Sequence, residues 1–139
     1  MYTFAEIETE YSRLNRIFSG TDKPSKFPYG FNRDDFGGLH LELKLDGVMA
    51  LVGTERGKET FRSETSSLNE LMYWVFRNKA KSKAQAYELQ NRHPTNDSRR
   101  IWFELSIKLL ELVSEQWAKR LEYEYEQILQ QHPYRDKAC

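Results

Sequence analysis

Residues 39–54 read LHLELKLDGVMALVGT, and this stretch decides the fold. Its first half alternates leucine with polar side chains. This period of two predicts a strand with its leucines, including Leu45, on one buried face and His40 on the outer face. Asp46-Gly47 predicts a tight type I′ hairpin turn, which needs positive φ at both central residues. The mostly apolar residues 48–54 then return as a second strand.

The residues after this hairpin extend it into a small sheet. Gly57 marks a second turn, and residues 59–64 can supply a third strand. The result is a three-stranded antiparallel meander over residues 39–64. An isolated sheet of this size is only marginally stable in water, so we expect helices to cover one of its faces.

The residues before the sheet predict one helix and one long loop. Thr3 and Glu6 fit a capping box, and apolar side chains then recur at steps of three and four, which predicts a helix over residues 1–20. Prolines, glycines and aromatic residues interrupt residues 21–38, so this segment is predicted to be an ordered loop.

Residues 67–131 predict two or three long helices that pack on the sheet. The first begins with an apolar face, loses it among lysines and regains it at Ala86, Tyr87 and Leu89. Each later helix presents an apolar stripe, at Ile101, Leu105, Leu109 and Leu112 and then at Trp117, Leu121, Tyr125, Ile128 and Leu129. Residues 132–139 form a tail. The predicted fold class is therefore α+β, in a single domain over residues 1–139.

Composition excludes several classes of protein. Lysine plus arginine and aspartate plus glutamate both total 21, so the formal net charge is zero, whereas a dedicated nucleic-acid binder usually carries a basic excess. No apolar run approaches the roughly 20 residues of a membrane-spanning helix. The N-terminus lacks the segments of a secretory signal, and the single cysteine, Cys139, allows no intrachain disulfide. We expect a cytoplasmic protein that binds neither nucleic acid nor membrane directly.

The sequence holds no recognisable catalytic or metal-binding motif. No serine has the flanking glycines of a nucleophile elbow, and the glycine pairs are wrongly placed for a phosphate loop. The three histidines lack the spacing of metal ligands, and two of them precede prolines at helix ends, where a structural role is expected. We therefore predict no catalytic residue, no metal, no cofactor and no enzymatic activity.

Two arginines are unusual because of their place at the start of a helix. Arg99 and Arg100 lie in its first turn, where positive charge opposes the helix dipole, so they are expected to have carboxylate partners. We interpret them as part of a structural polar network at an element junction, with a ligand or partner site as the alternative. The predicted network comprises Glu55, Arg56, Glu88, Asp97, Arg99 and Arg100.

A set of residues scattered over roughly residues 50–136 forms a connected pattern. Its members are Glu55-Arg56-Gly57, the run NELMYWVF at 69–76, Tyr87-Glu88-Leu89 with Arg92, Asp97 with Arg99-Arg100, Trp117, and His132-Pro133-Tyr134 with Asp136. This pattern resembles the immunity protein 63 family of bacterial polymorphic toxin and contact-dependent growth inhibition systems. The resemblance implies a small cytosolic protein that binds a cognate toxin C-terminal domain, commonly a nuclease, and neutralises it without enzymatic activity.

Such a role suggests where a partner would bind. A nuclease presents positive potential to phosphates, so its inhibitor is expected to use acidic side chains around an aromatic or aliphatic anchor. The predicted partner-binding residues are Glu122, Tyr123 and Glu126, facing away from the apolar stripe of the last helix, and Tyr29, Asp34 and Asp35 in the long loop.

A second function class stays open beside this one. A small-ligand or RNA-binding regulatory module would use the basic segment 77–92, and loss of affinity for generic RNA with rising salt would support it. The free protein is predicted to be a monomer or a weak dimer, because the broad apolar surface of the helix after Asp97 suits either a core or a dimer seam.

Overall fold

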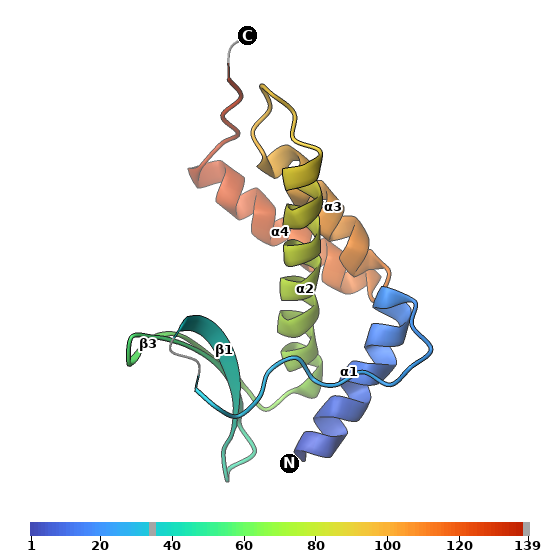
Figure 1. Ribbon diagram of the computed structural model, residues 1–139, viewed down its shortest axis with the longest axis vertical. Coiled ribbons are helices and arrows are strands. Elements are labelled where there is room, and N and C mark those ends of the chain that lie inside the picture. The colour runs from blue at the N-terminus through green and yellow to red at the C-terminus, as the bar shows by residue number, and fades with distance from the viewer. Residues whose placement is uncertain (34–35, 138–139) are drawn as a thin grey trace. The chain divides into compact units, whose positions relative to one another are not determined.

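The computed structural model of the protein describes residues 1–33 and 36–137 (Figure 1). The elements are α1 (Phe4–Ser19), β1 (Phe36–Leu43), β2 (Met49–Glu55), β3 (Lys58–Thr65), α2 (Leu68–Gln90), α3 (Arg99–Glu111) and α4 (Glu115–Gln131). The predicted α+β class, with one helix, a three-stranded antiparallel sheet and three further helices, is confirmed. The chain divides into two compact units, residues 1–72 and residues 73–139. The single domain stays a prediction.

The first helix begins and ends where its capping residues require. The Thr3 side chain accepts from the Glu6 backbone N–H at 3.2 Å, and Glu6 accepts from the Thr3 backbone N–H at 3.0 Å, so the predicted capping box is confirmed. Gly20 ends the helix in the left-handed conformation, with φ of 69°. Ile7 and Tyr11 lie on its buried side.

The sheet of the first unit has the order β1-β2-β3, so β2 is the central strand. Leu51 of β2 lies opposite Leu41 of β1 and Ser63 of β3. Residues 49–54 of β2 are buried without alternation, as expected of a strand covered on both faces, whereas β3 is mostly exposed.

One prediction for β1 was wrong, and one was correct in direction but not in exposure. Leu45, expected on the buried face, is 96% exposed. Strand β1 ends at Leu43, and the Lys44 backbone N–H donates to the Val48 carbonyl at 2.9 Å, which closes a loop that contains Leu45. His40 lies on the outer face as predicted, on the same side of the sheet as Glu42 and Arg62, but it is only 5% exposed. Its Nε2 lies 3.0 Å from a carboxylate oxygen of Glu42, whereas its buried Nδ1 has no hydrogen-bond partner within the described residues.

The type I′ turn lies in the second hairpin and not in the first, where it was predicted. In Asp46-Gly47, only Gly47 has positive φ, at 89°, so the predicted type I′ turn is wrong there. The turn between β2 and β3 instead has positive φ at both central residues, 51° at Arg56 and 78° at Gly57, as a type I′ turn requires.

Charged side chains cover the outer face of the sheet. Residues that lie directly opposite one another on antiparallel strands share a face, so Ala50 lies between Glu42 and Glu64. In the same way, Val52 lies between His40 and Arg62. Both apolar residues are at most 1% exposed, so the long polar side chains beside them exclude water.

Arg62 holds this polar layer together. Its guanidinium donates to Glu42 at 3.1 Å, to Glu59 at 2.7 Å and to Glu64 at 3.2 Å. Lys44 also bonds to Glu64. Hydrogen bonds from Arg62 and Lys44 lower the pKa of Glu59 and of Glu64, respectively, so these carboxylates stay ionised at neutral pH.

In the second unit, the buried side of α2 narrows along its length. Past Phe76 the buried positions recur at steps of four, at Ala80, Ala84 and Glu88. The predicted return of an apolar face is wrong, because Ala86 is exposed and Tyr87 and Leu89 are 51% and 66% exposed. Three successive steps of four residues lead from Phe76 to Glu88, which therefore takes the buried position instead. Arg92 neutralises its charge.

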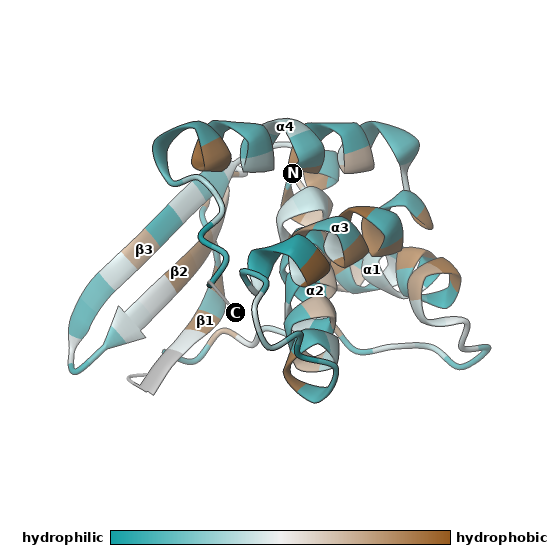
Figure 2. Ribbon diagram, turned by 90° about the horizontal axis from the view of Figure 1, so that it is seen from above, coloured by the Kyte–Doolittle hydropathy of each residue, from teal (hydrophilic) through white to brown (hydrophobic). Residues whose placement is uncertain are grey.

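Helices α3 and α4 each combine hydrophobic and hydrophilic surfaces (Figure 2). The stripe predicted for α4 is correct for Trp117, Leu121 and Tyr125, whereas Ile128 is 39% exposed. On α3 the fully buried positions are Phe103, Ser106 and Leu110, and the predicted stripe residue Leu112 is 56% exposed. Apolar residues occupy most of the circumference of α3, so periodicity did not reveal its buried side. No helix within residues 1–33 and 36–137 is long and apolar enough to cross a membrane.

Candidate functional site

A groove of about 410 Å³ runs between α3 and α4 in the second unit. On each helix its lining residues recur at steps of three and four, which places them on one helical face. They are Phe103, Glu104, Ile107, Lys108 and Glu111 from α3, Glu122, Tyr125, Glu126 and Leu129 from α4, and Tyr134 from the tail.

The floor of the groove is apolar and well ordered by its contacts. The rings of Phe103 and Tyr125 stack with their centroids 3.9 Å apart. The Tyr125 hydroxyl lies 2.6 Å from the Ser106 hydroxyl, so its polar end is satisfied inside the unit. Burial raises the pKa of Tyr125 to about 12, and the phenol therefore stays neutral at physiological pH. Side chains of Ile107 and Leu129 are partly exposed and give the groove an apolar surface.

The rim of the groove is acidic. Glu104 pairs with Lys108 at 3.2 Å, which neutralises one position. Glu111, Glu122 and Glu126 are exposed, and none of the three carboxylates has an ion-pair or hydrogen-bond partner within the described residues. Three unpaired negative charges therefore surround an apolar floor. The site can attract a cationic surface and bury an apolar side chain.

The tail forms one end of the groove and is clamped in place. The guanidinium carbon of Arg100 lies over the Tyr134 ring, 4.2 Å from the ring centroid. Arg100 also forms an ion pair with Asp136 at 2.9 Å. Arg99 pairs with Asp97 at 2.8 Å and also donates to the backbone carbonyls of residues 132 and 133. The hydrogen bond from Arg99 lowers the pKa of Asp97 well below its usual range.

The residues of the predicted polar network fall into separate groups. Asp97, Arg99 and Arg100 meet in the clamp just described, together with Tyr134 and Asp136. Glu88, in the last turn of α2, pairs with Arg92 just beyond the helix, and this hydrogen bond lowers the pKa of Glu88. Glu55 and Arg56 lie in the exposed turn between β2 and β3 and make no ion pair within the described residues.

The predicted partner-binding residues lie in several places. Glu122 and Glu126 line the groove, and Tyr123, between them in sequence, is 62% exposed but does not line it. Tyr29 belongs to the loop of the first unit, where its ring packs edge-on against Phe27 with centroids 5.8 Å apart. Asp34 and Asp35 lie outside the described residues.

Sequence reasoning missed the α3 side of the groove. Glu104, Lys108 and Glu111 follow one another at steps of four and three, beside apolar residues at 103 and 107. That spacing is a detectable signal of an acidic edge along an apolar stripe. It did not reveal that α4 would bring Glu122 and Glu126 to the other edge.

The basic side chains of the segment 77–92, considered for RNA binding, contact other groups of the protein. Arg77 donates to Glu124 at 2.9 Å, and the Lys81 ammonium lies 5.6 Å from the centroid of the Tyr125 ring. Burial lowers the pKa of Lys81. Lys79 and Lys83 also have partners within the protein. These contacts leave no row of free cations that would follow a phosphate backbone.

The fold and the groove can be compared with known proteins. Neither a curated protein nor a solved structure matches the chain. The family model described as Immunity protein 63 matches residues 46–127, which run from the turn before β2 through most of α4. The match includes all of α3 and residues 115–127 of α4, the two helices that form the groove, and it spans more than half of the chain. The protein therefore belongs to the Immunity protein 63 family, and its role is in toxin immunity.

Proposed function

We propose that the protein neutralises a cationic toxin domain, a nuclease, by binding it on the acidic groove between α3 and α4. The observation that carries the proposal is the position of Glu111, Glu122 and Glu126 around an apolar floor, with no ion-pair or hydrogen-bond partner for any of these carboxylates among the residues that the structure describes. A nuclease cleft exposes Lys and Arg to hold phosphates, so these carboxylates would oppose its charge while the floor receives an apolar anchor.

This mode of action needs only binding. The protein would act in the cytoplasm as a single-domain monomer or weak dimer, and it would block the toxin C-terminal domain rather than modify it. Long-range attraction from the rim would speed association, and burial of an apolar anchor on the floor would slow dissociation.

Co-expression with the reading frame immediately upstream in the native locus tests the proposal. We expect the encoded toxin domain to arrest growth alone, and to be bound stoichiometrically and neutralised when this protein is present. Replacing both rim carboxylates of α4 in the E122Q/E126Q variant should weaken the complex about tenfold or more, mainly through slower association at low salt.

A matched control separates position from net charge. The Q127K/Q131K variant also raises the net charge by two, but it changes exposed α4 residues that do not line the groove. We expect its affinity to stay within about threefold of the unmodified protein. Equal losses for both variants would show that overall charge, and not the groove, controls binding. A toxic neighbour that is neither bound nor neutralised would refute the proposed function itself.

A further inference from the structure

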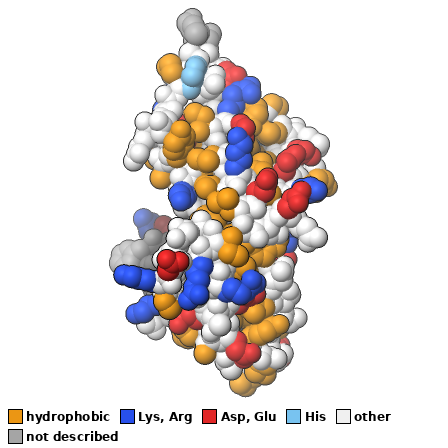
Figure 3. Space-filling model, turned by 90° about the vertical axis from the view of Figure 1, so that its right-hand side faces the viewer, with side chains coloured by type: hydrophobic (Ala, Val, Ile, Leu, Met, Phe, Trp, Pro, Cys, Tyr) orange, Lys and Arg blue, Asp and Glu red, His pale blue; other side chains and the backbone are white. Residues whose placement is uncertain are grey.

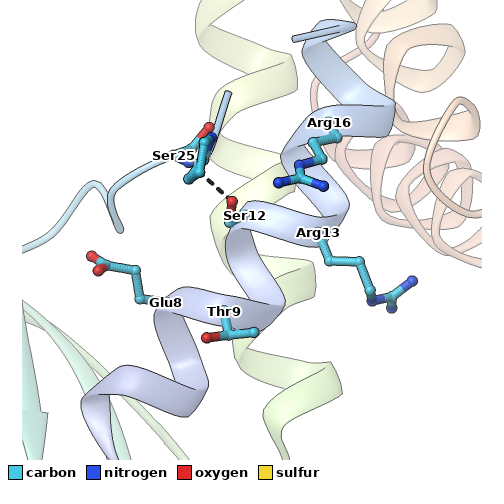
Figure 4. A pocket seen from close by; sticks show the side chains of 7 residues that line it. Glu8, Thr9, Ser12, Arg13, Arg16 and Ser25 are labelled. Atoms are coloured by element: carbon cyan, nitrogen blue, oxygen red, sulfur yellow. Dashed lines mark hydrogen bonds between the residues drawn. The ribbon is translucent and has the colours of Figure 1, made fainter. Parts of the chain in front are cut away.

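A second hollow, of about 450 Å³, lies in the first unit between α1 and residues 24–25 (Figure 4). Ser12, Arg13 and Arg16 line it from one face of α1, and Ser25 lines it from the loop. It lies outside residues 46–127, so the family match does not account for it.

Partly buried hydrogen bonds shape this hollow in advance of any ligand. Asn15, which is 7% exposed, donates from its side-chain nitrogen to the Ser25 hydroxyl at 2.8 Å and accepts from Ser19 at 2.9 Å. The Ser25 backbone N–H in turn donates to the Ser12 hydroxyl at 2.9 Å. Both lining hydroxyls therefore already accept a hydrogen bond.

The hydrogens of the same two hydroxyls remain available to donate to a ligand. Neither Ser12 nor Ser25 donates its hydroxyl hydrogen to any group within the described residues. A hydroxyl that accepts one bond still offers one O–H donor. Two O–H donors from two different segments are thus available at one hollow.

Arg16 adds an unpaired charge beside these hydroxyls. Its guanidinium extends toward Ser12 in Figure 4, whereas that of Arg13 points away. Arg13 is already satisfied by Glu10 through two hydrogen bonds of 2.5 and 3.1 Å. Arg16 has no ion-pair or hydrogen-bond partner for its side chain in the part of the chain that the structure describes.

The surroundings of the hollow are positive. Residues 12–26 contain four basic side chains and a single acidic one. Figure 3 shows several Lys and Arg side chains in its lower half, with Asp and Glu side chains among them. A local positive potential raises the concentration of anions near the surface and favours their binding.

We propose that this hollow binds a phosphoryl group, free or esterified, with Arg16 as the charged contact and the Ser12 and Ser25 hydroxyls as neutral donors. A guanidinium presents paired N–H donors that fit two phosphate oxygens. Donors from α1 and from the loop approach from different directions, and a tetrahedral oxyanion offers acceptors in more directions than a planar carboxylate does. This site is independent of the acidic groove.

Glu8 sets a limit on the affinity. Its carboxylate also lines the hollow and accepts from the Phe27 backbone N–H at 2.9 Å. The negative charge of Glu8 would repel a bound anion. Removing this charge should therefore raise the affinity for phosphate, whereas removing the charge of Arg16 should lower it. The E8Q variant keeps an acceptor for Phe27 and removes the charge, so it should bind phosphate about threefold more tightly.

Amide chemical-shift titration of the full chain tests the site with inorganic phosphate and adenosine monophosphate, against sodium chloride at matched ionic strength. We expect saturable shifts at residues 12–16 and 24–25 for at least one phosphate compound. The R16Q variant should weaken binding about tenfold, whereas R13Q, which removes the same charge from a paired arginine, should stay within about threefold.

Comparison of the ligands and variants identifies the bound group and shows which results would overturn the proposal. Tighter binding of the nucleotide would identify an esterified phosphate as the source, and equal binding would identify the free anion; both outcomes support a phosphoryl site. Acetate binding as tight as that of phosphate would overturn the phosphate assignment. Equal effects of R16Q and R13Q, or shifts that chloride reproduces, would overturn the site. Toxin neutralisation by R16Q should be unchanged, so this test and that of the groove fail separately.

Discussion

Phe103 and Tyr125 stack face to face across α3 and α4, with ring planes only 1° apart. The Ser106 hydroxyl donates to the Phe103 carbonyl at 2.8 Å, so the Tyr125 hydroxyl must be the donor in its 2.6 Å contact with Ser106. The two aromatic residues are therefore joined twice, once through their rings and once through a serine. This double connection holds the floor of the groove.

The serine link predicts an asymmetric effect of mutation. Ser106→Ala leaves the buried Tyr125 hydroxyl without a partner and should cost about 1–3 kcal/mol, whereas Tyr125→Phe leaves Ser106 bonded to Phe103 and should cost about 0.5–1.5 kcal/mol. Urea denaturation of both variants and of the double variant measures this. The double variant should be less destabilised than the sum of the two, and strict additivity would contradict the link.

The buried phenols predict sensitivity to alkali. Burial raises the pKa of Tyr125 to about 12 and that of Tyr73 as well, whereas an unfolded tyrosine ionises near pH 10. The folded state thus holds these protons more tightly, so stability is fully present below about pH 10 and falls as the pH rises toward 12. Urea midpoints between about pH 9 and 11.5 check this. The decline should be shallower in Tyr125→Phe, and an equal slope would contradict it.

The tail clamp predicts sensitivity to acid. Hydrogen bonds from Arg99 and Arg100 lower the pKa values of Asp97 and Asp136, so the clamp is stable above the usual carboxyl range and weakens as the pH falls below it. Asp136→Asn should loosen the tail at neutral pH. Trypsin should then cleave after Arg135 about tenfold faster, in proportion to the open population. Asp46→Asn, in an exposed turn of the first unit, is the control and should leave the rate unchanged.

The turn between β2 and β3 predicts a stabilising substitution. Arg56 has φ of 51°, a conformation that costs a non-glycine residue about 1–2 kcal/mol. Arg56→Gly should relieve this cost and raise the free energy of unfolding by a few tenths to about 1 kcal/mol, once the greater freedom of glycine in the unfolded chain is subtracted. Gly57→Ala, at φ of 78°, should destabilise the protein. Thermal unfolding of both variants gives the signs, and a loss of stability in Arg56→Gly would contradict the account.

Local patterns in the sequence predicted the elements well but not their ends. The capping box at Thr3 and Glu6 and the alternation around Leu41 depend on neighbours in sequence, and both were correct. Leu45 continued the alternation but fell in the turn, because the hydrogen bond between residues 44 and 48 ends the ladder sooner. Periodicity contains no information about which pair of residues closes a loop.

Only the α4 side of the groove was predicted from the sequence. Glu122 and Glu126 could be placed on the polar side of α4 from helical spacing alone. Glu111 and Tyr134 join them through tertiary packing, and the position of Tyr134 depends on arginines more than thirty residues earlier in the chain. Such an arrangement follows from the meeting of distant segments, which no local pattern specifies.

The charged layer over Ala50 and Val52 has a consequence for the protein at high concentration. A second sheet stacking on this face would have to displace Arg62 from its carboxylate partners and leave those charges away from water. The layer therefore opposes face-to-face stacking of this sheet on the sheet of another copy.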